Sequence, residues 1–121
     1  MQTLVCEQAS CPIDSTLKVI GGRWKTAVLY HLSSGTKRFG ELRRQLPNIT
    51  QRMLTLQLRE LEAAGLVRRT VYAEVPPRVE YDLTPWGESL RPVLDALSDW
   101  GKRYRRRLDS VARTAEGAPA E

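Results

Sequence analysis

The pattern of apolar and polar positions predicts a helix that begins after Thr50 and ends at Ala63 or Ala64. Three leucines recur at helical spacing and share one face of it: Leu54, Leu58 and Leu61. Thr50 is suited to cap the first turn, and Gly65 can supply the left-handed residue that ends a helix. The segment is therefore predicted to be an amphipathic helix that buries a leucine stripe.

Similar patterns predict three helices earlier in the chain. Pro12 can open the first, which the Gly21–Gly22 pair ends. The second covers "RWKTAVLYHL", residues 23–32, where apolar side chains again fall on one face. The third covers "RFGELRRQL", residues 38–46, and ends before Pro47, because the residue before a proline avoids helical geometry.

The pattern changes after Gly65. The segments "LVRRTVYAEV" and "RVEYDLT" are rich in Val, Tyr and Thr and are separated by Pro76–Pro77. Since prolines are excluded from the interior of paired strands, these segments predict a two-stranded ribbon with a stiff tip. Thr84–Pro85 then starts a long last helix, which Pro92 should kink or split.

The order of these elements predicts a fold that is mainly α with a small β-hairpin. Two short helices joined by a tight turn are typical of the helix-turn-helix, whose second helix enters the DNA major groove, and a ribbon directly after it forms a wing. The expected class is a winged helix-turn-helix with extra N- and C-terminal dimerisation helices. We expect a flexible arm at 1–11, the DNA-binding and dimerisation domain at 12–108, and a flexible tail at 109–121.

One face of the 51–63 helix carries side chains that can reach base edges: Gln51, Arg52, Thr55, Leu56 and Arg59. Arginine suits guanine, glutamine suits adenine, and the threonine methyl suits thymine. None of these five residues is acidic, whereas an ordinary solvated helix face mixes Glu with Lys. Glu60 and Glu62 occur late in the helix, away from the end expected to enter the groove. Double-stranded DNA is therefore the predicted partner, with the cap Thr50 included among the contacts.

Leu56 is the exception on this face, and three interpretations are open. It packs against the turn or the wing as part of the core, or it contacts a thymine methyl. The third interpretation is a single exposed leucine of no consequence, which is common on protein surfaces.

The net charge of +5 is unevenly distributed. Residues 23–70 hold ten Lys or Arg against three Glu, whereas residues 71–98 hold two Arg against five acids. Such a basic block is the footprint of a polyanion binder. The predicted phosphate contacts are Lys37, Arg38, Arg43, Arg44 and Arg78. Arg68 and Arg69 point to opposite faces of their strand, so at most one of them can face DNA directly.

Composition and motifs argue against membrane, secreted, metal-binding and enzyme classes of protein. No apolar run approaches the ~18 residues of a membrane span, and the start of the chain lacks a secretory signal pattern, so a cytoplasmic protein is expected. Cys6 and Cys11 alone are too few to bind a metal. His31 is the only histidine, and no paired carboxylates or phosphate-binding glycine loop appear. We therefore expect no enzyme activity, cofactor or metal.

Several segments in order carry a family resemblance: "CP", "GGRWKTAVLYHL", "RFGELRRQLPNITQRMLTLQLRELEAAGLVRR", "EVPPRVEYDLT" and "LRPVLDAL..WG". From Cys11 to about Gly101 the chain resembles the HxlR-type family of bacterial winged-helix regulators, within the MarR-like superfamily. The resemblance implies a homodimeric repressor, with interleaved first and last helices, on a pseudo-palindromic operator. Two residues depart from the family pattern. Leu56 stands where a polar residue is usual, and Trp86 marks an extra dimer contact or a small pocket.

The last helix supports a homodimer independently, since it has more apolar surface than one small domain needs. The predicted interface residues are Leu17, Leu90, Leu94, Leu97, Trp100 and Tyr104. Trp24 and Trp100 are interpreted as core or interface residues and not as ligand-binding ones.

Cys11 falls, by the resemblance, at the family's N-terminal cysteine, which in some members senses electrophiles or oxidants. A helix N-terminus attracts negative charge and so favours a reactive thiolate. The alternative is a small cysteine buried at the dimer interface. Cys6 lies outside the matched region. A small electrophile or oxidant acting on Cys11 is thus a further expected partner.

A winged-helix module that contacts protein or RNA without binding an operator is the competing function. It predicts acids or an apolar patch on the outer face of the 51–63 helix. The sequence places Gln, Arg and Thr there instead.

Overall fold

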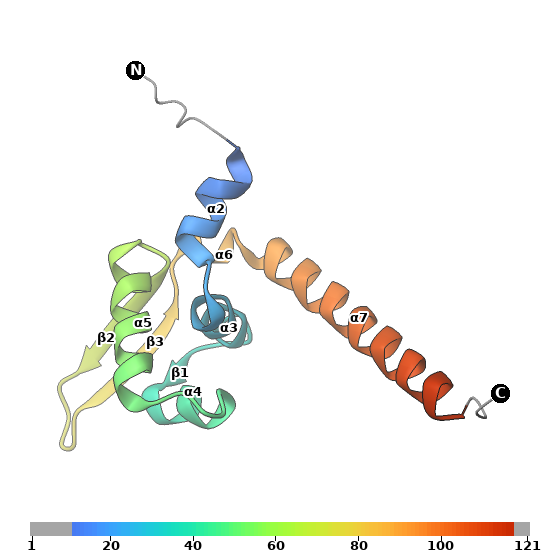
Figure 1. Cartoon of the computed structure of the whole chain (residues 1–121). Coiled ribbons are helices and arrows are strands. Elements are labelled where there is room, and N and C mark those ends of the chain that lie inside the picture. The colour runs from blue at the N-terminus through green and yellow to red at the C-terminus, as the bar shows by residue number, and fades with distance from the viewer. Residues whose placement is uncertain (1–10, 118–121) are drawn as a thin grey trace.

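The computed structural model describes residues 11–117. Its elements in chain order are α2 (Pro12–Ile20), α3 (Arg23–Leu32), β1 (Lys37–Arg38), α4 (Phe39–Gln45), α5 (Gln51–Ala63), β2 (Val67–Tyr72), β3 (Arg78–Leu83), α6 (Pro85–Glu88) and α7 (Arg91–Gly117). Figure 1 shows α3, α4, α5 and the strands gathered in one body, from which α2 and α7 project in different directions. The predicted fold class, helical with a small sheet beside a helix-turn-helix, is confirmed.

The sheet has three antiparallel strands in the order β1-β3-β2. β2 and β3 form the predicted hairpin, with a register that runs from Val67 opposite Leu83 to Tyr72 opposite Arg78. β1 was not predicted, because two residues are too few to show a periodic pattern. It exists because Lys37 pairs with Tyr81, far along the chain.

One hydrophobic core joins the helices to the sheet. It contains Ile20, Val28, Leu29, Leu32, Leu42, Leu46, Ile49, Leu54, Leu58, Leu61, Leu66, Val67, Tyr81, Leu83 and Leu94. The three leucines predicted to line the inner face of α5 are therefore all in it. α3 contacts both α5 and α7 and so lies between these two helices. Trp24 packs against this core, within the range of roles predicted for it.

Both ends of α5 are fixed as the sequence predicts. The Thr50 hydroxyl accepts a hydrogen bond from the Met53 backbone N–H at 3.0 Å. Gly65 ends the helix with φ +80°, a conformation that side chains with a Cβ rarely adopt. The turn between α4 and α5 contains Asn48 at φ +75°, and asparagine tolerates this region better than most residues. These local signals set where the helix begins, ends and points.

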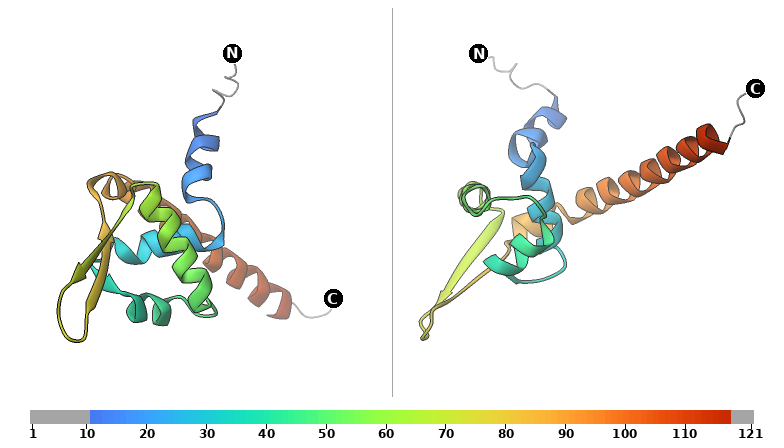
Figure 2. Two further views of the ribbon diagram at one scale, coloured as in Figure 1. Left: turned by 90° about the vertical axis from the view of Figure 1, so that its left-hand side faces the viewer. Right: turned by 60° about the horizontal axis from the view of Figure 1, so that its bottom comes forward.

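The last helix is split, as Pro92 predicts. α6 ends at Glu88, and α7 starts at Arg91 with Pro92 in its first turn, where the missing N–H does no harm. α7 continues to Gly117, so residues 109–117 are helical where the sequence predicts a flexible tail. Figure 2 shows α7 as a long arm extending from the body. The predicted arm at 1–11 lies, except for Cys11, outside the described residues.

Candidate nucleic-acid interface

The outer face of α5 brings together the five side chains predicted to reach base edges. Gln51, Arg52, Leu56 and Arg59 are exposed, and Thr55 is half-buried. The Thr55 hydroxyl donates to the Gln51 carbonyl oxygen at 2.9 Å. Because the leucines of the opposite face are buried, α5 is held by its apolar side and offers its polar side to the surface.

Leu56 is 45% exposed and is not part of the core. It lies in an open hollow of about 610 Å³ whose lining comes only from α5 and its cap, namely Thr50, Gln51, Arg52, Met53, Thr55 and Arg59. The interpretation that Leu56 packs against the turn or the wing is therefore wrong. A thymine contact and a merely exposed leucine are the two interpretations left.

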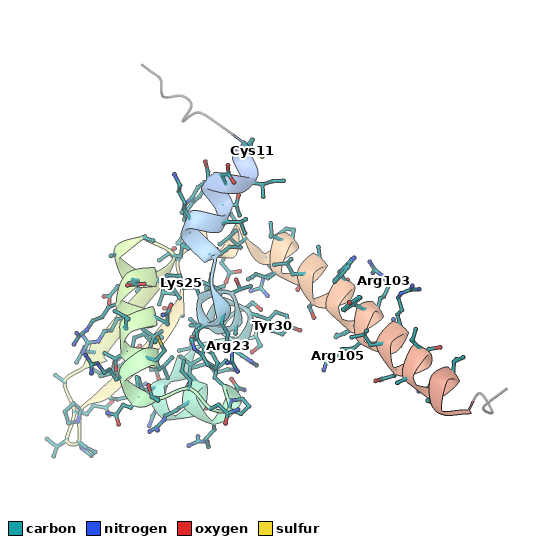
Figure 3. All side chains as sticks on the ribbon, viewed as in Figure 1. Cys11, Arg23, Lys25, Tyr30, Arg103 and Arg105 are labelled. Atoms are coloured by element: carbon teal, nitrogen blue, oxygen red, sulfur yellow. The ribbon has the colours of Figure 1, made fainter. Side chains whose placement is uncertain are left out.

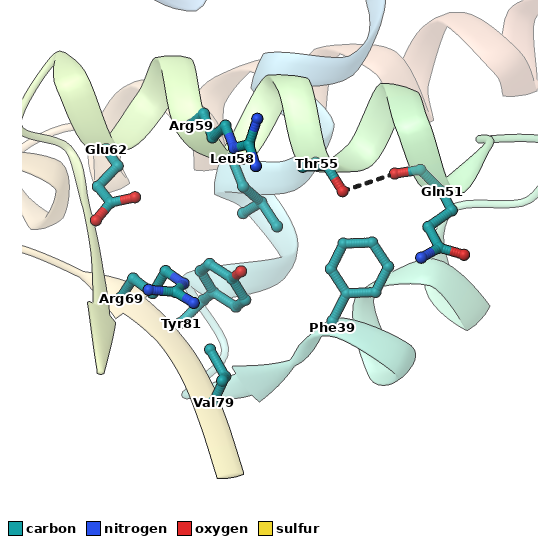
Figure 4. A pocket seen from close by; sticks show the side chains of 9 residues that line it. All are labelled: Phe39, Gln51, Thr55, Leu58, Arg59, Glu62, Arg69, Val79 and Tyr81. Carbon is teal, nitrogen blue, oxygen red and sulfur yellow. Dashed lines mark hydrogen bonds between the residues drawn. The ribbon is translucent and has the colours of Figure 1, made fainter. Parts of the chain in front are cut away.

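A cleft of about 490 Å³ separates α5 from the wing, which we define as β2, β3 and their connection. Its lining is Phe39, Gln51, Thr55, Leu58, Arg59, Glu62, Arg69, Val79 and Tyr81. Figure 4 shows Arg59 and Glu62 on α5 facing the cleft from one side and Arg69 facing it from the other. Arg69 was not among the predicted contacts, although the alternation of strand side chains indicated that one of two neighbouring arginines would face this way.

The neighbouring Arg68 faces the opposite side of the wing, where it binds another side chain. Its guanidinium binds the Asp82 carboxylate through two hydrogen bonds, of 3.1 Å and 2.5 Å. The hydrogen bond to Asp82, together with its charge, raises the pKa of Arg68 above its ordinary value. Asp82 lies directly opposite Arg68 in the β2–β3 register, so the pairing follows from the fold.

Arg78, a predicted phosphate contact, is held by two acids of its own hairpin. It binds Glu74 at 2.9 Å and Glu80 at 2.5 Å. Its guanidinium also lies 3.8 Å from the centre of the Tyr72 ring. Hydrogen bonds to Glu74 and Glu80 raise the pKa of Arg78. The charge is therefore compensated locally in the free chain, and the phosphate contact of Arg78 stays a prediction.

The other predicted phosphate contacts lie in or near α4. Arg38, Arg43 and Arg44 are exposed, whereas Lys37 is half-buried in β1. The Arg38 backbone N–H donates to Glu41 Oε1 at 2.8 Å, which stabilises the start of α4. Arg43 and Arg44 lie in the last turn of α4, where positive charge suits the helix dipole.

Lys25 of α3 binds α5 on the side of that helix that lies next to α3. Its ammonium donates to Gln57 Oε1 at 3.0 Å and forms an ion pair with Glu60. Gln57 and Glu60 are about one helical turn apart, so a single lysine holds two points of α5. Sequence reasoning missed this contact, because it joins residues more than 30 positions apart.

A second exposed surface is apolar and lies on α2 and α7. Its members are Ile13, Leu17, Val19, Val93, Leu97, Trp100, Tyr104, Leu108 and Val111, and we call them the apolar seam. The Trp100 and Tyr104 rings stack with their centres 5.0 Å apart. On α7 the seam recurs every three or four residues, which is the spacing of a helix face that packs on another helix.

Two predicted interface residues do not belong to the apolar seam. Leu94 is 1% exposed and lies in the core of its own chain, so its assignment to a dimer surface is wrong. Leu90 is half-buried against the same core. Both lie at the base of α7, where the helix packs on the body. Trp86 is exposed beside a small cavity of about 210 Å³ between α2 and α6.

Cys11 is exposed and free, and it is the N-cap residue of α2. The Asp14 N–H donates to the Cys11 carbonyl oxygen at 2.9 Å, which closes the first turn. Figure 3 marks Cys11 at the outer end of α2, away from the body. The predicted position at a helix N-terminus is confirmed. Cys6 lies outside the described residues.

The described residues offer little for other chemistry. Within them, no group of three or more His, Cys, Asp or Glu side chains is arranged to hold a metal ion. None of the helices in this part of the chain is long and apolar enough to cross a membrane. Burial, with a smaller contribution from the charge of Lys37, lowers the pKa of His31.

Residues 19–109 match the family described as HxlR-like helix-turn-helix. The chain belongs to the HxlR-like family. It is 56% identical over 108 residues to the uncharacterized HTH-type transcriptional regulator YdeP of Bacillus subtilis, covering 88% of this chain and 84% of YdeP. The HxlR-like chain is accordingly a DNA-binding transcriptional regulator.

Solved structures agree with this assignment. The redox regulator HypR in its oxidized form is 57% identical and covers 77% of this chain and 96% of its own, with a TM-score of 0.75. HypR in its reduced form is 55% identical and covers 83% of this chain and 99% of its own, with a TM-score of 0.77. The HxlR-like fold is thus shared over 77% of this chain in one comparison and 83% in the other.

Proposed function

We propose that this regulator binds a pseudo-palindromic operator as a homodimer and represses transcription. In this proposal each subunit places α5 in a major groove, where Gln51, Arg52, Thr55 and Leu56 face base edges and Arg59 contacts the DNA on the side of the wing. Arg38, Arg43 and Arg44 bind phosphates beside it, with Lys37 and the cap Thr50 close by. The observation that carries the proposal is the outer face of α5, which is exposed, free of acid from Gln51 to Arg59, and supported on its inner side by packed leucines.

The apolar seam supports the homodimer. A single chain that exposes nine large apolar side chains on two projecting helices leaves an unfavourable surface in water. A two-fold pairing of α2 and α7 with a second copy would bury this surface and repeat α5 at the spacing of two half-sites. Leu17, Leu97, Trp100 and Tyr104 are the interface residues of the proposal.

Cys11 is the proposed site of regulation. The related HypR is named a redox regulator, and Cys11 is exposed at the N-terminus of α2, on one of the two proposed dimer helices. An oxidant or electrophile that modifies the thiol would add bulk or charge beside the apolar seam. We expect this modification to release the operator. In the proposal the protein acts on DNA in the cytoplasm, and no catalytic role is part of it.

The test is binding to the DNA upstream of the chain's own gene, measured at several salt concentrations. We expect a sequence preference and a steep fall in affinity as salt rises, because phosphate contacts release counterions. A flat salt dependence with no sequence preference would favour a module that contacts protein or RNA.

Arg52→Ala probes the placement of α5. If Arg52 contacts a base, the variant loses about 1–3 kcal/mol of specific binding and relaxes one operator position. Arg113→Ala, on α7, removes the same charge far from α5 and serves as the control. Unchanged operator affinity in Arg52→Ala would contradict the placement.

Cys11→Ser probes regulation. The serine variant should bind the operator like the wild type, yet keep binding after treatment with a quinone or hypochlorite. Loss of binding by the treated variant would show that Cys11 is not the sensing residue.

A further inference from the structure

The cleft between α5 and the wing contains an unusual arrangement of charge. Arg59 and Arg69 face it from its two sides, and Glu62 lies one helical turn from Arg59 on the same wall. All three are exposed, and none of them forms a salt bridge with another side chain in the described part of the chain. Every other charged residue of the wing forms a salt bridge within the hairpin, so Arg69 is the wing's one available cation within that part.

The position of the cleft indicates which part of a bound DNA duplex would lie in it. When a helix occupies a major groove and the following hairpin reaches the neighbouring minor groove, the sugar–phosphate strand between the two grooves lies between helix and hairpin. Here those two elements are α5 and the wing, and the cleft between them holds about 490 Å³. A phosphodiester there would meet the guanidinium groups of Arg59 and Arg69.

We propose that this cleft is a seat for one DNA phosphodiester, bound by Arg69 and Arg59, and that Glu62 weakens this binding by repulsion. The inference rests on the proposed operator binding and adds the backbone contact that neither sequence motif nor family assigns. Arg69 increases affinity for any duplex, and Glu62 limits it. Because a phosphate carries no sequence information, both residues change affinity without changing which sequence is preferred.

The floor of the cleft fits this role. Leu58, Tyr81, Phe39 and Val79 form an apolar base beneath the charged rim. Leu58 and Tyr81 are buried in the core, so the floor is rigid. An arginine above an apolar floor loses part of its hydration and binds a phosphate more strongly than one extended into water.

Arg69→Gln and Arg68→Gln form a matched pair of variants. The two arginines are adjacent, both exposed, and differ in that Arg68 is bound to Asp82 on the other side of the wing. Arg69→Gln should weaken specific and non-specific DNA binding equally, by roughly 8-fold at 0.1 M salt, and reduce the salt slope by about 0.9. Arg68→Gln should leave the slope unchanged. Arg69→Lys should restore the slope, and thermal unfolding confirms that each variant is folded.

Glu62→Gln should change DNA affinity in the opposite direction. Removing the repulsion should tighten binding to both operator and random duplex by about 2- to 5-fold, with their ratio unchanged. Asp99→Asn on α7 makes the same change in net charge away from the cleft and should have no effect. A changed ratio in Glu62→Gln would mean that this residue reads bases, which would overturn its role in the seat.

The phosphate itself can be located with duplexes that carry one uncharged methylphosphonate at successive backbone positions. At the seated phosphate, the wild type should lose more affinity than Arg69→Gln does, since in that variant only Arg59 is left to contact this phosphate. Additive losses at every position, or equal slope changes in Arg68→Gln and Arg69→Gln, overturn the seat while operator binding stands. Absence of salt-dependent DNA binding by the wild type overturns the proposed function and the seat together.

Discussion

The outer face of α5 and the apolar seam are both exposed, but they differ in chemistry. The face of α5 presents arginines, glutamine and threonine around a single leucine, whereas α2 and α7 present large apolar side chains at helical spacing. The first surface is stable in water and gains from meeting a polyanion. The second gains by leaving water. The difference matches the two partners proposed for this chain, DNA for α5 and a second copy for the seam.

The largest effect should come from placing a charge in the seam. Leu97 is 50% exposed, so Leu97→Glu should fold, but a buried carboxylate without a partner opposes association. We expect the dimer dissociation constant, measured by sedimentation equilibrium, to rise at least roughly 30-fold, since interface hot spots contribute about 2 kcal/mol or more. Operator affinity should fall with it.

Ser110→Glu is the control for that variant, because it adds the same acid to α7 away from the seam. It should leave the dimer intact. If both variants dissociate equally, net charge and not the seam governs association.

A smaller effect should separate the two interpretations of Leu56. If Leu56 contacts a thymine methyl, Leu56→Ala should cost about 1 kcal/mol at one operator position. Its free energy of unfolding should change by less than about 0.5 kcal/mol, because the side chain is outside the core. Replacing operator thymines one at a time by uracil removes the methyl group. At the contacted position, wild type should lose affinity and Leu56→Ala should not.

If uracil affects wild type and Leu56→Ala equally at every position, Leu56 is simply exposed. The two surfaces would then differ fully in chemistry, because no apolar side chain on the outer face of α5 would contact DNA.

The smallest effect concerns α3, which lies between the two surfaces. The pKa of His31 is lowered in the folded chain, chiefly by burial, so the unfolded chain takes up its proton first as pH falls. Stability should therefore be constant above the ordinary pKa of about 6.5 and decline as pH falls below it. Chemical denaturation at pH 7.5 and pH 5.5 should show a decline in wild type that is smaller in His31→Gln. An equal decline in both would assign the effect to other groups.

Local signals made α5 predictable. Thr50, Gly65 and the leucine stripe lie within one stretch of 16 residues, and each acts through backbone geometry or helical spacing. The hairpin and the split at Pro92 followed from residues that restrict the backbone in the same way. Such features depend on neighbours in the chain and need no knowledge of the fold.

Two features differed from the predictions because of contact between residues far apart in the chain. β1 exists because Lys37 reaches Tyr81, and Leu94 is buried because α7 packs on α3. The charge of Arg78 is compensated by Glu80, two residues away on the same strand, and by Glu74 in the turn. These ion pairs depend on the geometry of the folded hairpin. The length of α7 was missed because the end of the chain is rich in Ala, Gly and Glu, a composition that resembles a loose tail.

The packing of Leu94 has a mechanical consequence. α7 is 27 residues long, roughly 40 Å at about 1.5 Å per residue, and it is anchored in the body near one end. It therefore acts as a lever with its pivot at Leu94. A rotation of about 10° at the pivot would move the far end by roughly 7 Å, a large fraction of the ~12 Å width of a major groove. Small adjustments at the base of this arm can thus bring two recognition helices into, or out of, step with the turns of DNA.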